Sequence, residues 1–365
     1  MATQMKVLVA LSGGVDSSVS LALLAERMEK VGDIARLEAA YIKTWMHEED
    51  PIGECSWQED IADATAVCKK LGVPFRIINL IGEYEKHVVK MLVDGYAKGI
   101  TPNPDIACNR FVKFGAFLDL AQAEGFTHLA TGHYAQKREN ADGTFSLLEG
   151  ADPNKDQSYF LAQLNQAQLS RALFPVGHLL KPDVRKEAER FALPNAAKKD
   201  SQGICFLGKV KINDFLARYL PDKPGAIVNT AGKEIGKHKG LHHYTLGQRK
   251  GMGIPSNTDD EHYVVIAKDF EKNILCVGFD HATTPGLYAD KFQLHHIHWV
   301  RPLGQIPTAI LARPRYRDPK VPATLSLDEA GQGTLTFATP QRALAAGQLV
   351  AFHLENELVG SGIYL

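Results

Sequence analysis

The first half of the chain alternates between short apolar runs and longer segments in which apolar residues recur every three or four positions. The short runs include "KVLVAL" (6–11), "LEAAYIKTW" (37–45), "PFRIINL" (74–80) and "THLATG" (127–132). Between them lie helical patterns such as "SVSLALLAERM" (18–28). The first pattern predicts buried strands and the second predicts helices. Their alternation with short links predicts an α/β domain with a doubly wound parallel sheet, which binds ligands at the carboxyl ends of its strands.

The pattern changes in the second half of the chain. "NADGT" (140–144) predicts a hairpin turn, and helical segments then continue to about Leu193. Beyond Val210 one short helical pattern is followed by strand pairs, which predict a small mixed or mostly β domain. From about Pro285, alternating strands separated by Gly, Pro and Asp predict a small β-barrel. The sequence therefore predicts a catalytic domain (1–208), a central domain (209–283) and a C-terminal β-barrel (284–365).

The composition is that of an ordinary globular protein. The chain has 365 residues, of which 45% are hydrophobic and 23% charged, enough for two or three domains with apolar cores. No apolar run reaches membrane-spanning length, and the first strand pattern begins at once, without a cleavable signal or transit segment. The 5 cysteines are irregularly spaced and form no C-x-x-C pair, which argues against a disulfide framework and an iron–sulfur site. We expect a cytoplasmic protein with free thiols and no membrane partner.

Charge is unevenly distributed along the chain. The formal net charge is only -1, which by itself argues against a nucleic-acid partner. Between His178 and Lys250, however, 15 Lys and Arg residues stand against 7 Asp and Glu residues, an excess of +8. A segment of this kind can bind a polyanion such as nucleic acid. An ordinary solvated surface is the alternative.

A glycine- and serine-rich loop joins the first strand to the first helix, in the stretch "LVALSGGVDSSVS" (8–20). Gly13 and Gly14 expose backbone amides, and the positive end of the following helix adds to an anion site for which nucleotide phosphate is the leading ligand. The loop has neither G-x-x-x-x-G-K-[ST] nor G-x-G-x-x-G, but reads S-G-G-x-D-S, in which Asp16 can hold magnesium beside phosphate oxygens. It resembles the PP-loop of ATP pyrophosphatases; a plain strand-to-helix turn is the alternative.

Two cysteines lie in settings that favour a thiolate. In "TPNPDIACNRFVKF" (101–114), Asp105 precedes Cys108 by three residues, just ahead of a helix whose positive end lowers the pKa of a nearby thiol. In "KKDSQGICF" (198–206), Cys205 follows two lysines. Two activated thiols imply sulfur chemistry, whereas structural cysteines in the core are the alternative. Asp105 can act as a general acid or base, or it can simply cap the helix.

The 14 histidines do not predict a metal site. Those in "GLHHYT" (240–245) and "QLHHIHW" (293–299) alternate with apolar residues as in strands, and no acid or cysteine accompanies them. A zinc site needs three or four such ligands. The sequence therefore gives no support to zinc at these positions.

Seven motifs, taken together and in order, resemble those of the tRNA-specific 2-thiouridylase (MnmA/TrmU) family of PP-loop ATP pyrophosphatases. They are "ALSGGVDSS", "TPNPDIACNRFVKF", "ATGHYA", "NKDQSYFLAQL", "KKDSQGICFLG", "GLHHYTLGQRKGMGI" and "RPRYR". The likeness runs from residue 6 to the end of the chain. Small departures, such as Ile42 where methionine is common, remove no reactive group.

The resemblance implies an ATP-dependent exchange of oxygen for sulfur at position 2 of the wobble uridine in certain tRNAs. ATP converts the oxygen into an AMP ester and releases pyrophosphate. Cys205 carries a persulfide supplied by a sulfur-relay donor protein, its terminal sulfur displaces AMP, and Cys108 frees the thiouridine by forming a Cys108–Cys205 disulfide. In an alternative order, Cys108 first liberates hydrosulfide as the nucleophile. The resemblance further implies ATP and Mg²⁺ as cofactors, and we expect a monomer.

The resemblance also implies which residues form the sites. Cys108, Cys205 and Asp105 would be catalytic, and Asp16 would hold Mg²⁺. The ATP site would consist of Ala10, Leu11, Ser12, Gly13, Gly14, Val15, Asp16, Ser17, Ile42 and Gly132. The tRNA site would consist of Asn103, Pro104, Asp105, His133, Lys155, Asp156, Gln157, Arg315, Tyr316 and Gln348. The alternative to RNA contact is a purely structural role, in which His133 is a strand-end histidine and "RPRYR" is a solvated edge strand.

Two other functions are compatible with a PP-loop. The first is amide formation by an adenylating synthetase or amidotransferase, or thiolation of another tRNA base; the N-terminal cysteine nucleophile of one amidotransferase class is absent. The second is a non-catalytic RNA-binding or sulfur-relay scaffold. The presence of Asp16, Cys108 and Cys205 argues against the scaffold.

Overall fold

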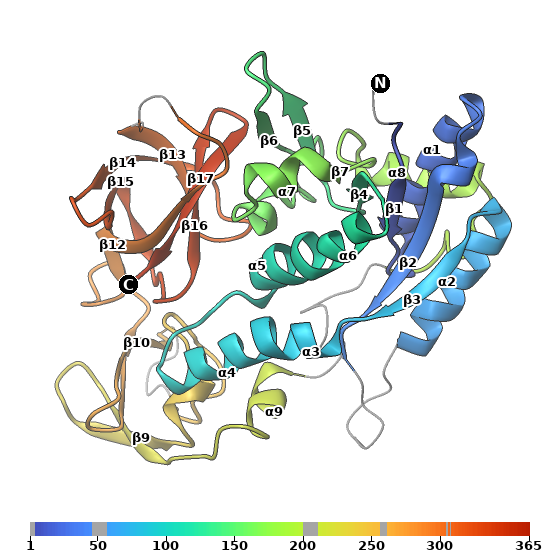
Figure 1. Ribbon diagram of the computed structural model, residues 1–365. Coiled ribbons are helices and arrows are strands. Elements are labelled where there is room, and N and C mark those ends of the chain that lie inside the picture. Colours follow the sequence, from blue (N-terminus) through green and yellow to red (C-terminus); the bar gives the residue numbers. More distant parts are fainter. Residues whose placement is uncertain (1–3, 46–56, 200–210, 256–260, 304–305, 307) are drawn as a thin grey trace.

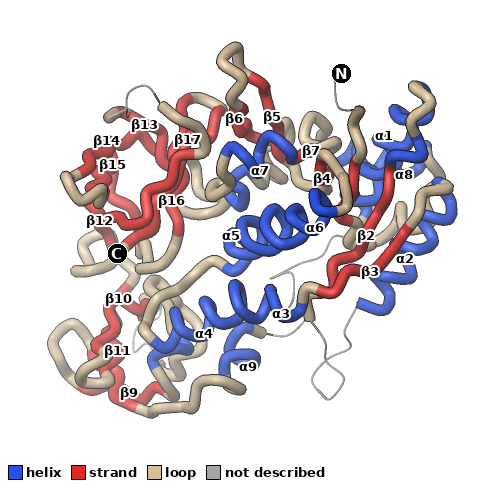
Figure 2. Tube along the Cα trace, viewed as in Figure 1, coloured by secondary structure: helices blue, strands red, loops and turns tan. Residues whose placement is uncertain are grey.

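The computed structural model describes residues 4–45, 57–199, 211–255, 261–303, 306 and 308–365 (Figure 1). An α/β domain, a small sheet domain and a β-barrel follow one another along the chain, which confirms the predicted fold class. Figure 2 shows most of the helices in the α/β domain, whereas the barrel is built of strands. None of the described helices is both long and apolar enough to span a bilayer.

The α/β domain is built on a five-stranded parallel sheet with the strand order β3-β2-β1-β4-β7. Its strands are β1 (Val7–Ala10), β2 (Leu37–Lys43), β3 (Phe75–Asn79), β4 (His128–Ala130) and β7 (Ala172–Leu173). Val7, Leu8 and Val9 are fully buried. Leu8 packs in one apolar cluster, and Val7 and Val9 pack in another. Both faces of β1 are therefore covered, as its continuous apolar run predicts.

Helices cover both faces of this sheet. The Val7 and Val9 face is covered by α1 (Val15–Lys30), α2 (Trp57–Leu71) and α8 (Lys181–Arg190). The Leu8 face is covered by α3 (Ile81–Tyr84), η2 (Glu85–Val89), α4 (Lys90–Ala97), α5 (Pro104–Ala107), η3 (Cys108–Phe117) and α6 (Leu118–Ala123). Shorter helical segments are η1 (Ile34–Arg36), η4 (Ser158–Leu161), α7 (Gln166–Arg171), α9 (Ile212–Leu216) and η5 (Leu241–His243).

The central domain holds a four-stranded mixed sheet with the order β10-β11-β8-β9. Its strands are β8 (Gly225–Val228), β9 (Glu234–His238), β10 (Tyr263–Asp269) and β11 (Ile274–Phe279). Strands β11 and β8 run parallel, and the other neighbours run antiparallel. Ile227, Val265 and Leu275 are fully buried at its centre.

The C-terminal strands are antiparallel and close into a barrel, because β12 pairs with both β15 and β17. The strands are β12 (Tyr288–Trp299), β13 (Ala309–Arg313), β14 (Val321–Leu327), β15 (Gly333–Arg342), β16 (Leu349–Leu354) and β17 (Glu357–Tyr364). The hairpin of β5 (Ala135–Glu139) and β6 (Phe145–Glu149) turns at "NADGT" as predicted, and β6 pairs with β17. A hairpin from the first half of the chain thus extends the barrel sheet.

A partly buried polar cluster joins the barrel to the α/β domain. Arg313 of β13 donates to Glu149 at 2.7 Å and to Asp156 at 2.9 Å, and Lys320 donates to Glu149 at 3.0 Å. The Tyr159 hydroxyl donates to a backbone carbonyl of β16 at 2.6 Å. These contacts bring one side of the barrel against the segment that follows β6.

Candidate active site

The loop between β1 and α1 forms an anion cradle at the carboxyl edge of the sheet. Gly14 occupies the N-cap position of α1 and offers no side chain to its first amides. Gly13 has a φ of +77°, and a Cβ there would lie 2.3 Å from the backbone oxygen of Asp60, so only glycine fits. The uncapped amides and the positive end of the helix favour an anion. The loop thus has the geometry of an anion site, while its binding of nucleotide phosphate stays a prediction.

Hydroxyl and amide side chains hold this loop in shape. The Ser17 and Ser18 hydroxyls donate to the Gly14 carbonyl at 3.0 and 2.9 Å. The side-chain amide of Asn195 donates to the Gly13 carbonyl and to the Ser18 hydroxyl, both at 2.9 Å. Asn195 is buried, and sequence reasoning did not identify it because it lies far from the loop in the chain. The cradle is therefore stabilised from outside its own motif.

Asp16 is held by two side chains from distant parts of the domain. Lys181 Nζ and the Tyr134 hydroxyl each donate to Asp16 Oδ1 at 2.7 Å. The Lys181 side chain is 13% exposed, and that of Asp16 is 32% exposed. The loop carries no lysine of its own, but α8 supplies one from 165 residues along the chain. No signal near the loop identifies Lys181, so sequence reasoning missed it.

The structure places the two other predicted nucleotide residues at the same edge of the sheet. Gly132 follows β4, and a Cβ there would lie 2.7 Å from the backbone nitrogen of Ser17. Ile42 lies near the carboxyl end of β2, two residues beyond Ala40, whose carbonyl accepts the Leu11 amide at 2.9 Å. The strand ends and the loop thus meet as the fold class predicts, while the role of these residues in ATP binding stays a prediction.

Asn103, and not Asp105, caps the helix that carries Cys108. Asn103 Oδ1 accepts the amides of Asp105 and Ile106 at 3.0 and 3.2 Å, and Pro104 occupies the first helical turn. Cys108 is 4% exposed and lies inside the helical segment, where α5 widens into the π-type segment η3. The sequence analysis expected a thiol just ahead of the helix. The structure instead places Cys108 beyond the first helical turn, where the positive field of a helix end is concentrated.

Cys205 lies outside the described residues, so its pairing with Cys108 stays a prediction. The segments on both sides of it are anchored. Upstream, Lys198 Nζ donates to Asp60 Oδ1 of α2 at 2.7 Å. Downstream, Phe215 of α9 belongs to the same apolar cluster as Cys108. Both flanks of the Cys205 segment therefore pack on the α/β domain.

Several of the predicted tRNA residues contact other parts of the protein. His133 is 8% exposed and shares a 2.7 Å hydrogen bond with a threonine hydroxyl; burial holds its pKa well below the usual value. Asp156 is 4% exposed and accepts from Arg313 at 2.9 Å. Gln157 accepts a backbone amide at 3.0 Å, and Lys155 is half-buried in the same turn. Their contact with RNA stays a prediction.

The predicted tRNA residues of the barrel lie on the side that faces the α/β domain. Arg315 donates to Asp318 at 2.9 Å, and the Tyr316 ring centroid lies 4.3 Å from that of Phe160. Gln348 lies just before β16, and its Oε1 is buried without a hydrogen-bond partner in the described part of the chain. The structure thus brings the barrel residues toward the domain that carries the cradle.

Ion pairs neutralise part of the basic excess between residues 178 and 250. Lys181, Arg190 and Lys198 each pair with a carboxylate that lies outside this segment. Lys186 pairs with an acid inside it. The positive charge that this segment presents to a polyanion is therefore smaller than the sequence count suggests.

Comparison with known proteins places these features in a family. Three family models match consecutive parts of the chain: a tRNA methyl transferase HUP domain (5–209), a tRNA methyl transferase PRC-barrel domain (213–279) and an aminomethyltransferase beta-barrel domain (289–364). The tRNA-specific 2-thiouridylase MnmA of Akkermansia muciniphila is 49% identical, with 98% of each chain covered. The enzyme of the same name from Pseudomonas syringae pv. syringae is 45% identical, with 98% of this chain and 93% of the relative covered. The one from Lacticaseibacillus paracasei is 42% identical, with 99% of this chain and 94% of the relative covered. The chain, with its S-G-G-x-D-S cradle, is therefore a member of the tRNA-specific 2-thiouridylase family.

Proposed function

We propose that this protein replaces oxygen by sulfur at position 2 of the wobble uridine in tRNA anticodons, with ATP as the activating substrate. The observation that carries the proposal is the anion cradle at Gly13 to Ser17, in a chain that aligns almost end to end with 2-thiouridylases. A carbonyl oxygen of a pyrimidine ring is a poor leaving group. Activation by a nucleotide is therefore the first chemical requirement.

The cradle supplies this activation by holding the pyrophosphate part of ATP. The uncapped amides of α1 would bind the phosphate oxygens, and Ile42 and Gly132 would border the adenosine. Asp16 offers a hard oxygen donor next to that anion site, which fits Mg²⁺, and the ion would neutralise phosphate charge there. The uridine oxygen then attacks the α-phosphorus, the bond to pyrophosphate breaks, and an AMP ester remains on the base. Lys181, beside Asp16, is placed to stabilise the same negative charge.

Sulfur transfer follows at the two cysteines. A donor protein loads Cys205 with a second sulfur, and the terminal sulfur of this persulfide attacks C2 of the base while AMP leaves. The Cys108 thiolate then attacks the inner sulfur, so that the thiouridine departs and a Cys108–Cys205 disulfide remains. A reductant restores both thiols. In the alternative order, Cys108 attacks the persulfide first, and the released hydrosulfide attacks C2.

The wobble base must leave the anticodon stack to reach the cysteines, and its pocket would lie where the loop before Asn103 meets the barrel. The Thr101 amide donates to the Ala346 carbonyl at 2.8 Å. Thr101 Oγ1 and Gln348 Oε1 are both buried there, and neither has a hydrogen-bond partner among the described residues. Buried polar atoms without partners are rare unless a ligand or water meets them. Together with Asp105, which would act as the general acid or base, these groups are suited to a polar base.

The test is reconstitution with an unmodified tRNA transcript, ATP, Mg²⁺ and a persulfide source, followed by mass spectrometry of the wobble nucleoside. Cys205→Ser and Cys108→Ser should each abolish repeated turnover. Cys276→Ser, which changes a cysteine of the central domain, is the matched control and should keep the parent rate. Parent-like turnover by Cys108→Ser or Cys205→Ser would contradict the two-thiol scheme.

The same variants distinguish the two orders of sulfur transfer. If the persulfide attacks C2 directly, Cys108→Ser should trap the tRNA on Cys205 through a disulfide, seen as a gel shift that a reductant reverses. If Cys108 releases hydrosulfide first, no such adduct forms. The absence of the adduct in a Cys108→Ser protein that still releases pyrophosphate would therefore support the hydrosulfide order.

A further inference from the structure

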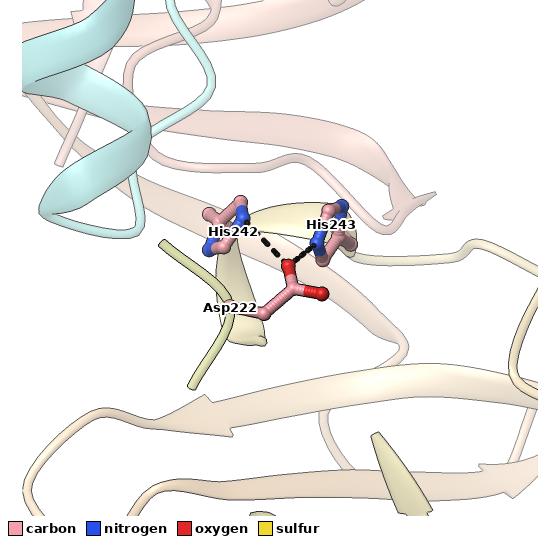
Figure 3. Close-up of side chains that lie close together, drawn as sticks. All are labelled: Asp222, His242 and His243. Atoms are coloured by element: carbon pink, nitrogen blue, oxygen red, sulfur yellow. Dashed lines mark hydrogen bonds and ion pairs between the residues drawn. The ribbon is translucent and has the colours of Figure 1, made fainter. Parts of the chain in front are cut away.

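Two adjacent histidines and an aspartate converge in the central domain (Figure 3). His242 and His243 lie in η5, and Asp222 lies in the connection from α9 to β8. Asp222 Oδ1 is 2.6 Å from His243 Nε2 and 3.8 Å from His242 Nε2. One ligand atom from each residue lies within 4.8 Å of the others, and no second cluster of this kind was found among the described residues.

The nitrogen of His242 that faces this cluster makes no hydrogen bond to any described residue and lies 3.8 Å from Asp222. His242 is 8% exposed, and its Nε2 is buried without a hydrogen bond within the described chain. Figure 3 shows this nitrogen and His243 Nε2 on the same side of the Asp222 carboxylate. A buried imidazole nitrogen that remains unpaired is unfavourable, so its position points to a ligand that accepts a lone pair.

We propose that Asp222, His242 and His243 bind one divalent transition-metal ion, for which Zn²⁺ fits best. Two imidazole nitrogens and one carboxylate oxygen form a ligand set that suits zinc, and three protein ligands leave a fourth position for water. In a tetrahedral zinc site the ligand atoms lie about 3.3 Å apart, as bond lengths of about 2.0–2.1 Å require. The distance from Asp222 Oδ1 to His243 Nε2 (2.6 Å) is shorter than this value, and the distance to His242 Nε2 (3.8 Å) is longer. The Asp222 side chain is 52% exposed and can turn to equalise them.

The position of the site indicates that the ion acts as a cross-link between two connections of the chain. Asp222 lies two residues beyond Leu220, which packs on the apolar cluster of the α/β domain. His242 lines a cavity of 230 Å³ whose walls include Leu220 and Tyr96 of α4. An ion bound here therefore joins the segment that follows Cys205 to the η5 turn of the central domain. The positive charge of Lys268 near His242 opposes a cation, so we expect weaker binding than at a closed four-ligand site.

The sequence shows no acid beside the histidines of "GLHHYT", and the structure corrects the expectation that they lack one. The acid is Asp222, which is separated from His242 and His243 in the chain by β8 and β9 but lies close to both in the structure. The spacing matches no common zinc motif. Three-dimensional proximity alone reveals the ligand set.

The test is metal binding by the full-length protein after treatment with a chelator and dialysis. Zn²⁺ is titrated by calorimetry, and Co²⁺ by its visible absorption. The parent protein should bind one equivalent of Zn²⁺ that Asp222→Asn and His242→Gln lose or bind at least about 10-fold more weakly. His281→Gln is the matched control, because His281 pairs with Glu261 at 2.7 Å in the same domain without a second imidazole. The parent protein and the three variants have the same cysteines, so any zinc bound by thiols is common to all four. The site is therefore judged by the difference in zinc binding between each variant and the parent protein.

A second readout keeps the test valid if a buried variant folds poorly. Asp222 is half exposed, so Asp222→Asn should fold, and Zn²⁺ should raise the Tm of the parent protein but not that of this variant. Equal zinc stoichiometry and equal thermal shifts in the parent protein and Asp222→Asn would overturn the proposal. The experiment uses neither ATP nor tRNA, so its outcome is independent of the proposed thiolation.

Discussion

Replacing Gly132 by alanine tests whether the nucleotide cradle depends on the close approach of β4 to α1. The new Cβ would lie 2.7 Å from the Ser17 nitrogen and 2.9 Å from the carbonyl carbon of Asp16. Ordinary van der Waals contact begins at 3.4 Å, so the two backbones must separate by about 0.7 Å. Both neighbours are backbone atoms of the first turn of α1, and no side-chain rotation can relieve the clash. The displacement therefore falls on the amides that would bind phosphate.

The size of the effect follows from this displacement. Overpacking of a close-packed site destabilises a protein by about 1–3 kcal/mol, and a misplacement of about 1 Å in a catalytic site lowers a rate about 100-fold. We expect Gly132→Ala to lower ATP-dependent pyrophosphate release by about 10- to 100-fold, measured with a coupled phosphate assay. The control is Gly82→Ala, because a Cβ at Gly82 meets nothing within 4 Å and alanine favours the helix α3. A Gly132→Ala protein with the parent rate and the parent KM for ATP would refute the reasoning.

Three further changes test other contacts. Lys181→Met removes the 2.7 Å ion pair with Asp16 and should lower pyrophosphate release at least about 10-fold, whereas Lys186→Met, which removes an exposed pair on the same helix, should leave it unchanged. Arg313→Gln leaves the buried Asp156 carboxylate without a cation, while Glu149 keeps Lys320, and should lower the free energy of unfolding in urea by about 3 kcal/mol; a loss below about 1 kcal/mol would contradict the role given to that cluster. Burial lowers the pKa of His353 to about 3, so below about pH 6.5 the unfolded chain binds a proton that the native chain does not. Stability should therefore fall by about 1.4 kcal/mol per pH unit between about pH 6 and 4, and an unchanged slope in His353→Gln would contradict this assignment.

The elements that the sequence predicts well are those whose signal is local. The run Val7 to Ala10 is apolar at every position because both faces of β1 are buried, and that pattern can be recognised without a structure. The cradle is equally local, since Gly13, Gly14 and Asp16 are neighbours in the chain. The same holds for the hairpin at 140–144, where turn residues interrupt two strands.

The features that sequence reasoning missed depend on long-range contacts. Lys181 contacts Asp16 from another helix, and β8 and β9 separate Asp222 from His242 in the chain. Neither pair has the short, fixed spacing that defines a sequence motif. The local pattern also left open whether Asp105 caps the Cys108 helix or acts as a general acid or base. The hydrogen bonds in the structure assign the cap to Asn103, which the local pattern had not identified as a cap.

The loop before the helix that carries Cys108 packs directly against the barrel. The Thr101 amide, two residues before the cap of that helix, donates to the Ala346 carbonyl of the barrel at 2.8 Å. Gly347 has a φ of +86°, and a Cβ there would lie 1.9 Å from Ile100 Cγ2, so the barrel turn and the loop meet without spare space. Close-packed contacts transmit a displacement because they cannot be compressed. If RNA binding shifted the barrel, the start of the helix that carries Cys108 would therefore move with it, which would couple the barrel to the proposed sulfur transfer.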